Sequence, residues 1–171
     1  MTNEDTLTVM SKDESVDNYT LERDKHILVA LDETENSKRA LLYVANFLGG
    51  QSGIRATLIR IIPEPSEDIF EDNSGRAEWI EDQFYKSTAM LKNYRDVLIQ
   101  SGFEGDKIVI KVIIINCTSI AESILEEQKK NRCCTVVVGR RAISRKEEFL
   151  FGSTTNRILH TDKKCALWVI E

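Results

Sequence analysis

Short apolar runs alternate along this chain with longer segments in which apolar residues recur every three or four positions. An unbroken apolar run is typical of a strand that is buried on both faces of a parallel sheet. A spacing of three and four residues instead predicts an amphipathic helix. The runs predict five strands, at residues 27–31, 56–62, 108–115, 135–138 and 166–170. The spaced segments predict four helices, at about residues 40–48, 76–100, 119–130 and 153–161.

The order of these elements predicts a doubly wound α/β fold. Consecutive strands are separated by helix-length connections, which require parallel pairing and right-handed crossovers. The length of 171 residues suits one domain of this kind. Ligands of such folds bind at the carboxyl ends of the strands, where the strand order changes direction. Functional residues are therefore expected where the apolar runs end.

The first part of the chain has a different composition. Residues 1–24 are polar and acidic and show no sustained periodicity. They predict a mobile leader that precedes a single domain over residues 25–171. Their start has neither a basic segment nor a following apolar stretch, so no secretory signal is expected.

The composition indicates which classes of partner and which cellular compartment are expected. The net charge of −5 and the pI near 5.2 argue against nucleic-acid binding, which usually requires a basic surface. The longest apolar run is interrupted by Lys111 and is far shorter than the ~20 residues of a membrane helix, so no membrane insertion is expected. The four cysteines lack C-x-x-C spacing, which disfavours a zinc site or a structural disulfide and fits a reducing cytoplasm.

The strongest functional pattern lies between residues 136 and 155. An apolar run ends at Gly139, a basic loop follows, and Gly152-Ser153-Thr154 opens the last predicted helix. At such a junction, unpaired backbone N–H groups converge and the helix dipole adds partial positive charge. This pattern predicts a phosphate-binding site and therefore a nucleotide-binding module.

Three common doubly wound families do not fit the strand ends. A dinucleotide-binding Rossmann domain needs a glycine-rich turn after its first strand, but residues 32–37 contain no glycine. The P-loop pattern G-x-x-x-x-G-K-[ST] is absent from the sequence. A response-regulator receiver needs an aspartate after the third strand and a lysine near the fifth, where this chain has Asn116 and Glu171.

The remaining pattern resembles the universal stress protein family from His26 onward. The opening motif is I-L-V-A-L-D-x-x-x-x-S, and the closing motif is V-V-V-G-R-R-A…F-L-F-G-S-T-T-N-R-I-L…C-A-L-W-V-I. Family members that bind ATP carry G-x-x-G-x9-G-[ST], and Gly139 and Gly152-Ser153 match its spacing. The resemblance implies a five-stranded parallel sheet of order 3-2-1-4-5 with helices on both faces, the adenine nucleotide α-hydrolase-like fold.

The resemblance also implies a phosphate and ribose site. Gly139 would let the backbone approach phosphate closely, and Gly152, Ser153 and Thr154 would donate hydrogen bonds to the triphosphate. Asp32 would accept hydrogen bonds from the ribose or the adenine. The same residues also suit structural roles: Asp32 in a turn, Gly139 at a strand end and Ser153 as a helix N-cap.

Further expectations follow from the same resemblance. Ile61 would hold the adenine, Ala30 and Leu31 would line the same crevice, and Arg140 would add positive charge near phosphate. The implied cofactor is ATP, with Mg2+ accompanying the bound nucleotide. The implied assembly is a homodimer formed through the final strand, residues 166–170. No residue identifies a further protein partner.

Ala142 departs from the family pattern, since it occupies the position of the second glycine. If that position requires positive φ, the alanine costs roughly 1–2 kcal/mol, about a tenfold loss of affinity. If the glycine makes room for a phosphate oxygen, the methyl group would exclude the ligand. The resemblance as a whole implies an ATP-dependent regulator of the stress response. It leaves open a nucleotide-free member that acts through protein contacts. An enzyme comes third, because no general acid–base pair is recognisable and at most slow ATP hydrolysis is expected.

Overall fold

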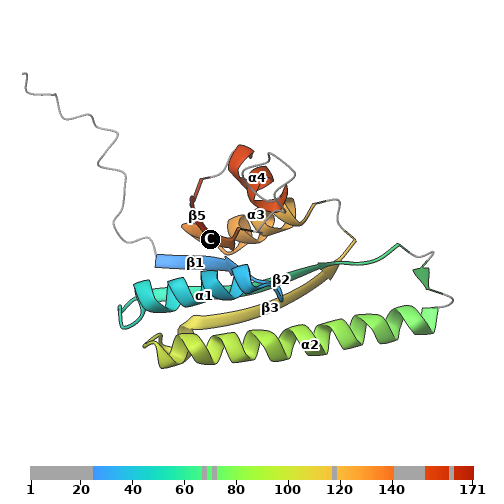
Figure 1. Ribbon diagram of the computed structural model, residues 1–171, viewed down its shortest axis with the longest axis horizontal. Coiled ribbons are helices and arrows are strands. Elements are labelled where there is room, and N and C mark those ends of the chain that lie inside the picture. Colours follow the sequence, from blue (N-terminus) through green and yellow to red (C-terminus); the bar gives the residue numbers. More distant parts are fainter. Residues whose placement is uncertain (1–24, 67–68, 71–72, 117–118, 141–152, 162–163) are drawn as a thin grey trace, which may run out of the picture.

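A computed structural model describes residues 25–66, 69–70, 73–116, 119–140, 153–161 and 164–171. Five parallel strands form one sheet in the order β3-β2-β1-β4-β5, as predicted (Figure 1). The strands are β1 Lys25–Ala30, β2 Ile54–Pro63, β3 Ile108–Ile115, β4 Thr135–Gly139 and β5 Ala166–Ile170. The order reverses direction between β1 and β4, so the carboxyl ends of these two strands mark the switch point of the sheet.

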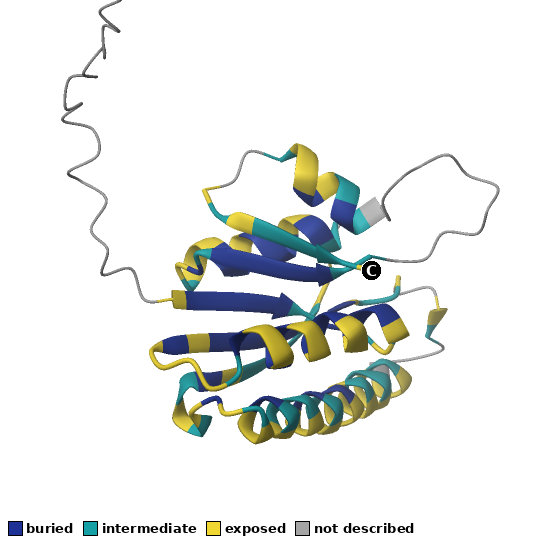
Figure 2. Ribbon diagram, turned by 60° about the vertical axis from the view of Figure 1, so that its left-hand side comes forward, coloured by how far each residue is buried: buried dark blue, intermediate teal, exposed yellow. Residues whose placement is uncertain are grey.

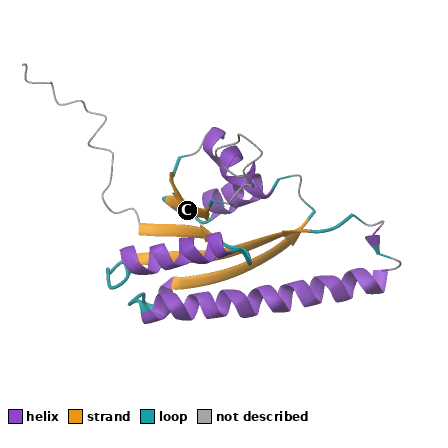
Figure 3. Cartoon of the chain, in the orientation of Figure 1, coloured by secondary structure: helices purple, strands orange, loops and turns teal. Residues whose placement is uncertain are grey.

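Helices cover both faces of the sheet (Figure 3). The helices α1 Glu35–Leu48 and α2 Asn73–Gln100 pack on one face, and α3 Ile120–Lys130 and α4 Ser153–His160 pack on the other. A short 3-10 helix, η2 Gly105–Lys107, precedes β3. No described helix is long and apolar enough to span a membrane.

Two boundaries differ from the predicted ones for physical reasons. Helix α1 begins at Glu35, earlier than its apolar spacing predicts, because Thr34 caps it by accepting a hydrogen bond from the Ser37 N–H. Strand β2 continues through Pro63, which is in register with Ile115 of the edge strand β3. Proline is tolerated as the last residue of the strand, and the next N–H, of Glu64, donates to the Ile115 carbonyl.

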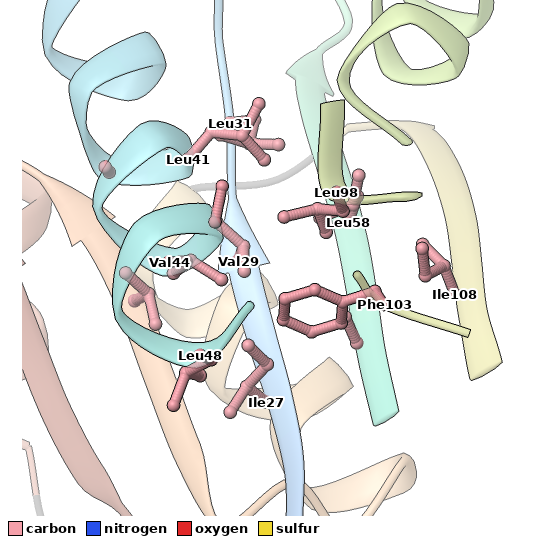
Figure 4. Packing of buried hydrophobic residues seen from close by; sticks show 14 of the residues in the cluster. Ile27, Val29, Leu31, Leu41, Val44, Leu48, Leu58, Leu98, Phe103 and Ile108 are labelled. Carbon is pink, nitrogen blue, oxygen red and sulfur yellow. The ribbon is translucent and has the colours of Figure 1, made fainter. Parts of the chain in front are cut away.

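The two cores lie on opposite faces of the central strands. In the core between the sheet and α1, Figure 4 shows Leu41, Val44 and Leu48 of α1 facing apolar side chains of β1. The other core joins residues of β1, β2 and β4 to α3 and α4. Strands β1 and β4 are almost entirely buried, whereas β5 is partly exposed at the sheet edge (Figure 2). This burial of both faces explains why the central strands are unbroken apolar runs.

Candidate functional site

A cleft opens where the carboxyl ends of β1, β2 and β4 meet α3 and α4. The described residues enclose about 90 Å³ of it. Pockets for drug-sized ligands usually measure roughly 300–1,000 Å³, so a mononucleotide would extend beyond this lining. The cleft is lined by Ala30, Leu31, Asp32, Thr34, Ser37, Ile59, Arg60, Ile61, Ile120, Ile124, Val138, Gly139, Thr154 and Thr155.

The loop after β1 fixes the carboxylate of Asp32. Its Oδ1 accepts hydrogen bonds from the Thr34 N–H at 2.9 Å and from the Ser37 hydroxyl at 2.6 Å, and the Thr34 hydroxyl donates to the same oxygen. The Asp32 N–H in turn donates to the Ser37 hydroxyl oxygen at 3.0 Å. The same Thr34 hydroxyl oxygen caps α1, so the orientation of Asp32 and the start of α1 are set together.

The acidity of Asp32 follows from these contacts. Burial raises the pKa of its carboxyl, but hydrogen bonds from Ser37 and Thr34 and the positive charge of Arg60 outweigh this effect. The net result is a pKa below the ordinary value. Asp32 is therefore a carboxylate at neutral pH, and a carboxylate can only accept hydrogen bonds. Ligand hydroxyl and amino groups are the natural partners of such a group.

Gly139 is required by the packing of the protein itself. A Cβ at this position would lie 2.5 Å from the carbonyl carbon and oxygen of Asn36 and 2.8 Å from the Ser37 nitrogen. All three are backbone atoms in the first turn of α1, which cannot move aside cheaply. The glycine thus lets α1 begin directly against the end of β4, and this close contact brings Asp32 and Val138 to one cleft.

Helix α4 closes the cleft from the other side. Thr155 is buried, Thr154 is partly buried, and both line the cleft, while Ile158 anchors the helix in the core shared with α3. Ser153 is the first residue of α4. Two further predicted site residues, Ala142 and Gly152, lie outside the described residues.

The structure brings six of the predicted residues together in the cleft. Ala30, Leu31, Asp32, Ile61, Gly139 and Thr154 all line the cleft. Arg140 does not belong to the lining. Its backbone N–H donates to the Ile170 carbonyl at 2.7 Å, and its guanidinium forms an ion pair with Glu171 at the end of β5.

Several lining residues were missed by the sequence reasoning. Ile120 and Ile124 lie four residues apart in the predicted helix, and this spacing is typical of core residues and does not indicate a ligand cleft. Thr34 and Ser37 had a usable signal, because a threonine just before a helix is a typical N-cap. The remaining missed residues are Ile59, Arg60, Val138 and Thr155.

Both histidines lie away from this cleft. His26 is buried near the start of β1, where its Nε2 lies 2.8 Å from the Thr57 hydroxyl and its Nδ1 lies 3.2 Å from the Asn131 carbonyl. His160 is exposed at the end of α4. Among the described residues, no group of three His, Cys, Asp or Glu side chains is placed to hold a metal ion.

Solved structures of low sequence identity share the fold. Universal stress protein UspA from Lactobacillus plantarum superposes with a TM-score of 0.67 at 14% identity, over 87% of this chain and 99% of that chain. A universal stress protein in complex with cAMP gives a TM-score of 0.64 at 18% identity, over 86% and 97%. The universal stress protein from Archaeoglobus fulgidus in complex with dAMP gives 0.59 at 14% identity, over 85% and 96%.

A search of curated proteins finds no match. The model of the universal stress protein family, in contrast, matches residues 24–170, nearly the whole chain. The match includes every described strand and helix and thus the complete cleft. The chain belongs to the universal stress protein family.

Proposed function

We propose that this protein binds ATP in the cleft at the switch point of the sheet and acts as a nucleotide-dependent regulator of the stress response. The observation that carries the proposal is the convergence of Asp32, Gly139 and Thr154 on one cleft, although they come from the loop after β1, from β4 and from α4. Two structural neighbours were solved with the adenine nucleotides cAMP and dAMP, which supports the same class of ligand.

The chemistry of the lining suits the parts of a nucleotide. Ile61, Ile120 and Ile124 offer an apolar wall for the adenine ring. The Asp32 carboxylate is held in place to accept hydrogen bonds from ribose hydroxyl groups. Thr154, at the start of α4, would donate to phosphate with the helix dipole behind it. Mg2+ would accompany the triphosphate and offset its charge.

Calorimetric titration of the full chain with ATP and Mg2+ tests this proposal. We expect a dissociation constant in the micromolar range, with cAMP and dAMP as competitors. Asp32→Asn should weaken binding about tenfold, because losing a hydrogen bond from the ribose to a carboxylate costs roughly 1.5 kcal/mol of binding free energy. Glu127→Gln is the matched control, because this carboxylate lies on α3 outside the cleft. Equal losses in both variants, or no heat at millimolar ATP, would contradict the proposed site.

A nucleotide-free role is the second candidate. It is favoured by Gly139, whose lack of a side chain is explained by its contact with Asn36 without any ligand. In that case the protein would act through protein contacts alone. The titration separates the two candidates. Absence of ATP binding would favour the nucleotide-free role. Binding that is abolished by heat denaturation but unaffected by Asp32→Asn would indicate a different nucleotide site.

We also propose that the protein forms a homodimer through β5. This strand lies at the sheet edge, where unpaired backbone groups favour pairing with a second copy. Beside it, Trp168 packs edge-to-face against Tyr43 and Phe47 of α1, with ring centroids 6.0 and 5.6 Å apart. Phe47 remains 56% exposed. The edge and this aromatic cluster together form a continuous surface that a second subunit would cover.

Light scattering of a charged variant tests the dimer. Phe47→Glu should convert a wild-type dimer to a monomer at micromolar concentration, because a carboxylate would be buried against the partner. Phe84→Glu is the matched control: Phe84 is similarly exposed, at 52%, but lies on α2 near the opposite edge of the sheet. A monomeric wild type, or the same loss of dimer in both variants, would contradict this interface.

A further inference from the structure

Three cysteines gather at the amino ends of β4 and β5, the opposite end of the sheet from the cleft. Cys133 and Cys134 precede β4 and Cys165 precedes β5, and all three carry thiols. Cys133 and Cys165 belong to the same apolar cluster on the α3 side of the sheet. Among the described residues no metal-binding group includes them.

The strand register brings Cys134 and Cys165 side by side. The first register pair of β4 and β5 is Thr135 with Ala166, and the two cysteines directly precede this pair. The Ala166 N–H donates to the Cys134 carbonyl at 2.9 Å, so the ladder already holds the backbone at this step. Neighbouring strands lie about 4.8 Å apart, and the Cα atoms of a disulfide usually lie about 4.4–6.8 Å apart. A bond between these two residues thus fits the spacing that the sheet imposes.

The two side chains have different neighbours. Cys165 packs against the apolar cluster on the α3 side of the sheet, together with Leu167 two residues further along the chain. The Cys134 sulfur lies 3.5 Å from the hydroxyl oxygen of the adjacent Thr135. A rotation of the Cys134 side chain away from Thr135 would bring its sulfur towards Cys165.

Accessibility separates Cys134 and Cys165 from Cys133. Cys134 and Cys165 are both partly exposed, whereas Cys133 is only 1% exposed. Burial raises the pKa of the Cys133 thiol to about 11, and the nearby Cys134 adds to this effect. A buried thiol with so little thiolate is inert towards oxidants, since the thiolate is the reactive form. Cys133 is thus a core residue, while its two neighbours can be reached from solvent.

We propose that Cys134 and Cys165 form a redox-responsive pair that closes to a disulfide when the protein meets hydrogen peroxide. One thiolate attacks an oxygen of the peroxide, the O–O bond breaks, and hydroxide leaves, giving a sulfenic acid. The second thiol then attacks the sulfenic sulfur, and its proton leaves with the hydroxyl group as water. The two sulfurs are oxidised by two electrons in total, and the peroxide is reduced to water.

The bond would act on the edge strand. Among the described strands, β5 is paired with β4 alone, and a crosslink at its first residues would tie it permanently to the sheet. Disulfides formed in a geometry that the backbone dictates are often strained and readily reduced, which suits a reversible bond. The pair would therefore report oxidation by fixing the start of β5, independently of nucleotide binding in the cleft.

Peptide mapping tests the proposal on the full chain. The protein is treated with hydrogen peroxide, alkylated, and digested with trypsin without reduction. Arg132, Arg140 and Lys164 are cleavage sites, so the digest contains residues 133–140 and residues 165–171 as separate peptides. We expect these peptides to appear joined by a disulfide after oxidation, with the linked form becoming the main form of both. Dithiothreitol should return them to separate, alkylated peptides.

Serine variants identify the partner of Cys165. Cys134→Ser and Cys165→Ser should abolish the linked peptide, whereas Cys133→Ser, the adjacent matched control, should retain it. Circular dichroism establishes whether each variant is folded. If a variant does not fold, fragment ions of the wild-type linked peptide still show which cysteine carries the bond. A bond from Cys133, a bond between two chains on non-reducing gels, or full alkylation of both thiols after peroxide treatment would each overturn the proposal.

Discussion

A carboxylate lies near each end of the sheet, and the two are stabilised in different ways. In the cleft, Asp32 is held by the hydroxyl and N–H groups of Thr34 and the hydroxyl of Ser37. Near the other end, Glu127 of α3 accepts hydrogen bonds from the Lys111 ammonium at 2.9 Å and from the Asn131 amide at 3.0 Å. Neutral donors dominate the first site, and an ion pair the second.

This difference separates the candidate ligand cleft from a structural contact. Lys111 cancels the charge of Glu127 and also donates to the Asn131 side chain, whose residue carbonyl lies against His26. The polar groups at this end thus join β1 and β3 to α3. Hydroxyl groups, in contrast, orient Asp32 without cancelling its charge, although Arg60 contributes through its field. A negative charge that is fixed and faces a cleft is suited to a ligand with hydroxyl groups.

The largest expected effect concerns Gly139, on which the geometry of the cleft depends. Gly139→Ala should lower the free energy of unfolding by about 3 kcal/mol, because the new methyl group meets the backbone of Asn36 at 2.5 Å. Urea denaturation measures this change. Gly105→Ala is the control, since its Cβ would meet only the Arg95 and Ile99 side chains, at 3.3 Å or more. Equal, small losses in both variants would show that α1 moves aside easily.

A smaller effect is expected at the other end of the sheet. Lys111→Met should cost about 1–2 kcal/mol, because it removes the nearer and less exposed of the two cations that pair with the Glu127 carboxylate, which is 11% exposed. Lys130→Met is the matched control: it also removes a cation from Glu127, 3.4 Å away, but the Lys130 side chain is 73% exposed and should matter by less than about 0.5 kcal/mol. Urea denaturation at neutral pH compares the two. A larger loss of stability in Lys130→Met than in Lys111→Met would show that solvent screening does not determine the strength of these ion pairs.

Two helix caps distinguish binding from stability. Thr34→Ala and Ser119→Ala each remove an N-cap, of α1 and of α3, and each should cost about 1 kcal/mol of stability. Thr34→Ala also removes a donor from Asp32 and should weaken ATP binding by about fivefold, whereas Ser119→Ala should leave it unchanged. Thermal denaturation and calorimetric titration measure the two effects. Parallel effects on affinity would mean that stability alone controls binding.

The smallest effect is a change in the pH dependence of stability. Burial raises the pKa of Glu127, but hydrogen bonds from Lys111 and Asn131 outweigh it, and the folded pKa lies below the ordinary 4.5. A lowered folded pKa contributes stability above the unfolded value, and this contribution is lost as the pH falls through the folded pKa. Wild-type stability should therefore begin to decline below about pH 4.5. Urea midpoints measured from about pH 6 to about pH 3 should decline less in Glu127→Gln. An identical decline would assign the acid sensitivity to other carboxylates.

Local pattern predicted most of the fold. The bounds of β3 and β5 agree with their apolar runs, and α3 differs from its predicted range by one residue. Unbroken runs and helical spacing are local properties, and the helix-length connections between strands leave only right-handed parallel topologies. The strand order itself followed from the family resemblance, because periodicity does not say which strands are neighbours.

The cleft was only partly predictable, because its members come from segments far apart in the sequence. The family resemblance implied a role for Arg140 near phosphate, which stays a prediction, and the structure adds an ion pair between its guanidinium and Glu171 after β5. Glycine at residue 139 was read as an approach for phosphate, and the structure adds the contact with Asn36 that requires it. Such contacts depend on how helices are seated on the sheet, which no local window of sequence contains.

The sequence by itself determined the alternation of strands and helices, the burial of the central strands and the position of glycine and hydroxyl residues at strand ends. Tertiary structure decided which of these residues share the cleft, how Asp32 is held, and that Cys134 and Cys165 directly precede the first register pair of two neighbouring strands. The physical reason is the sequence separation over which the interactions act. Backbone preference and apolar spacing act over a few residues, whereas side-chain packing and strand register act between segments that only the folded chain brings together.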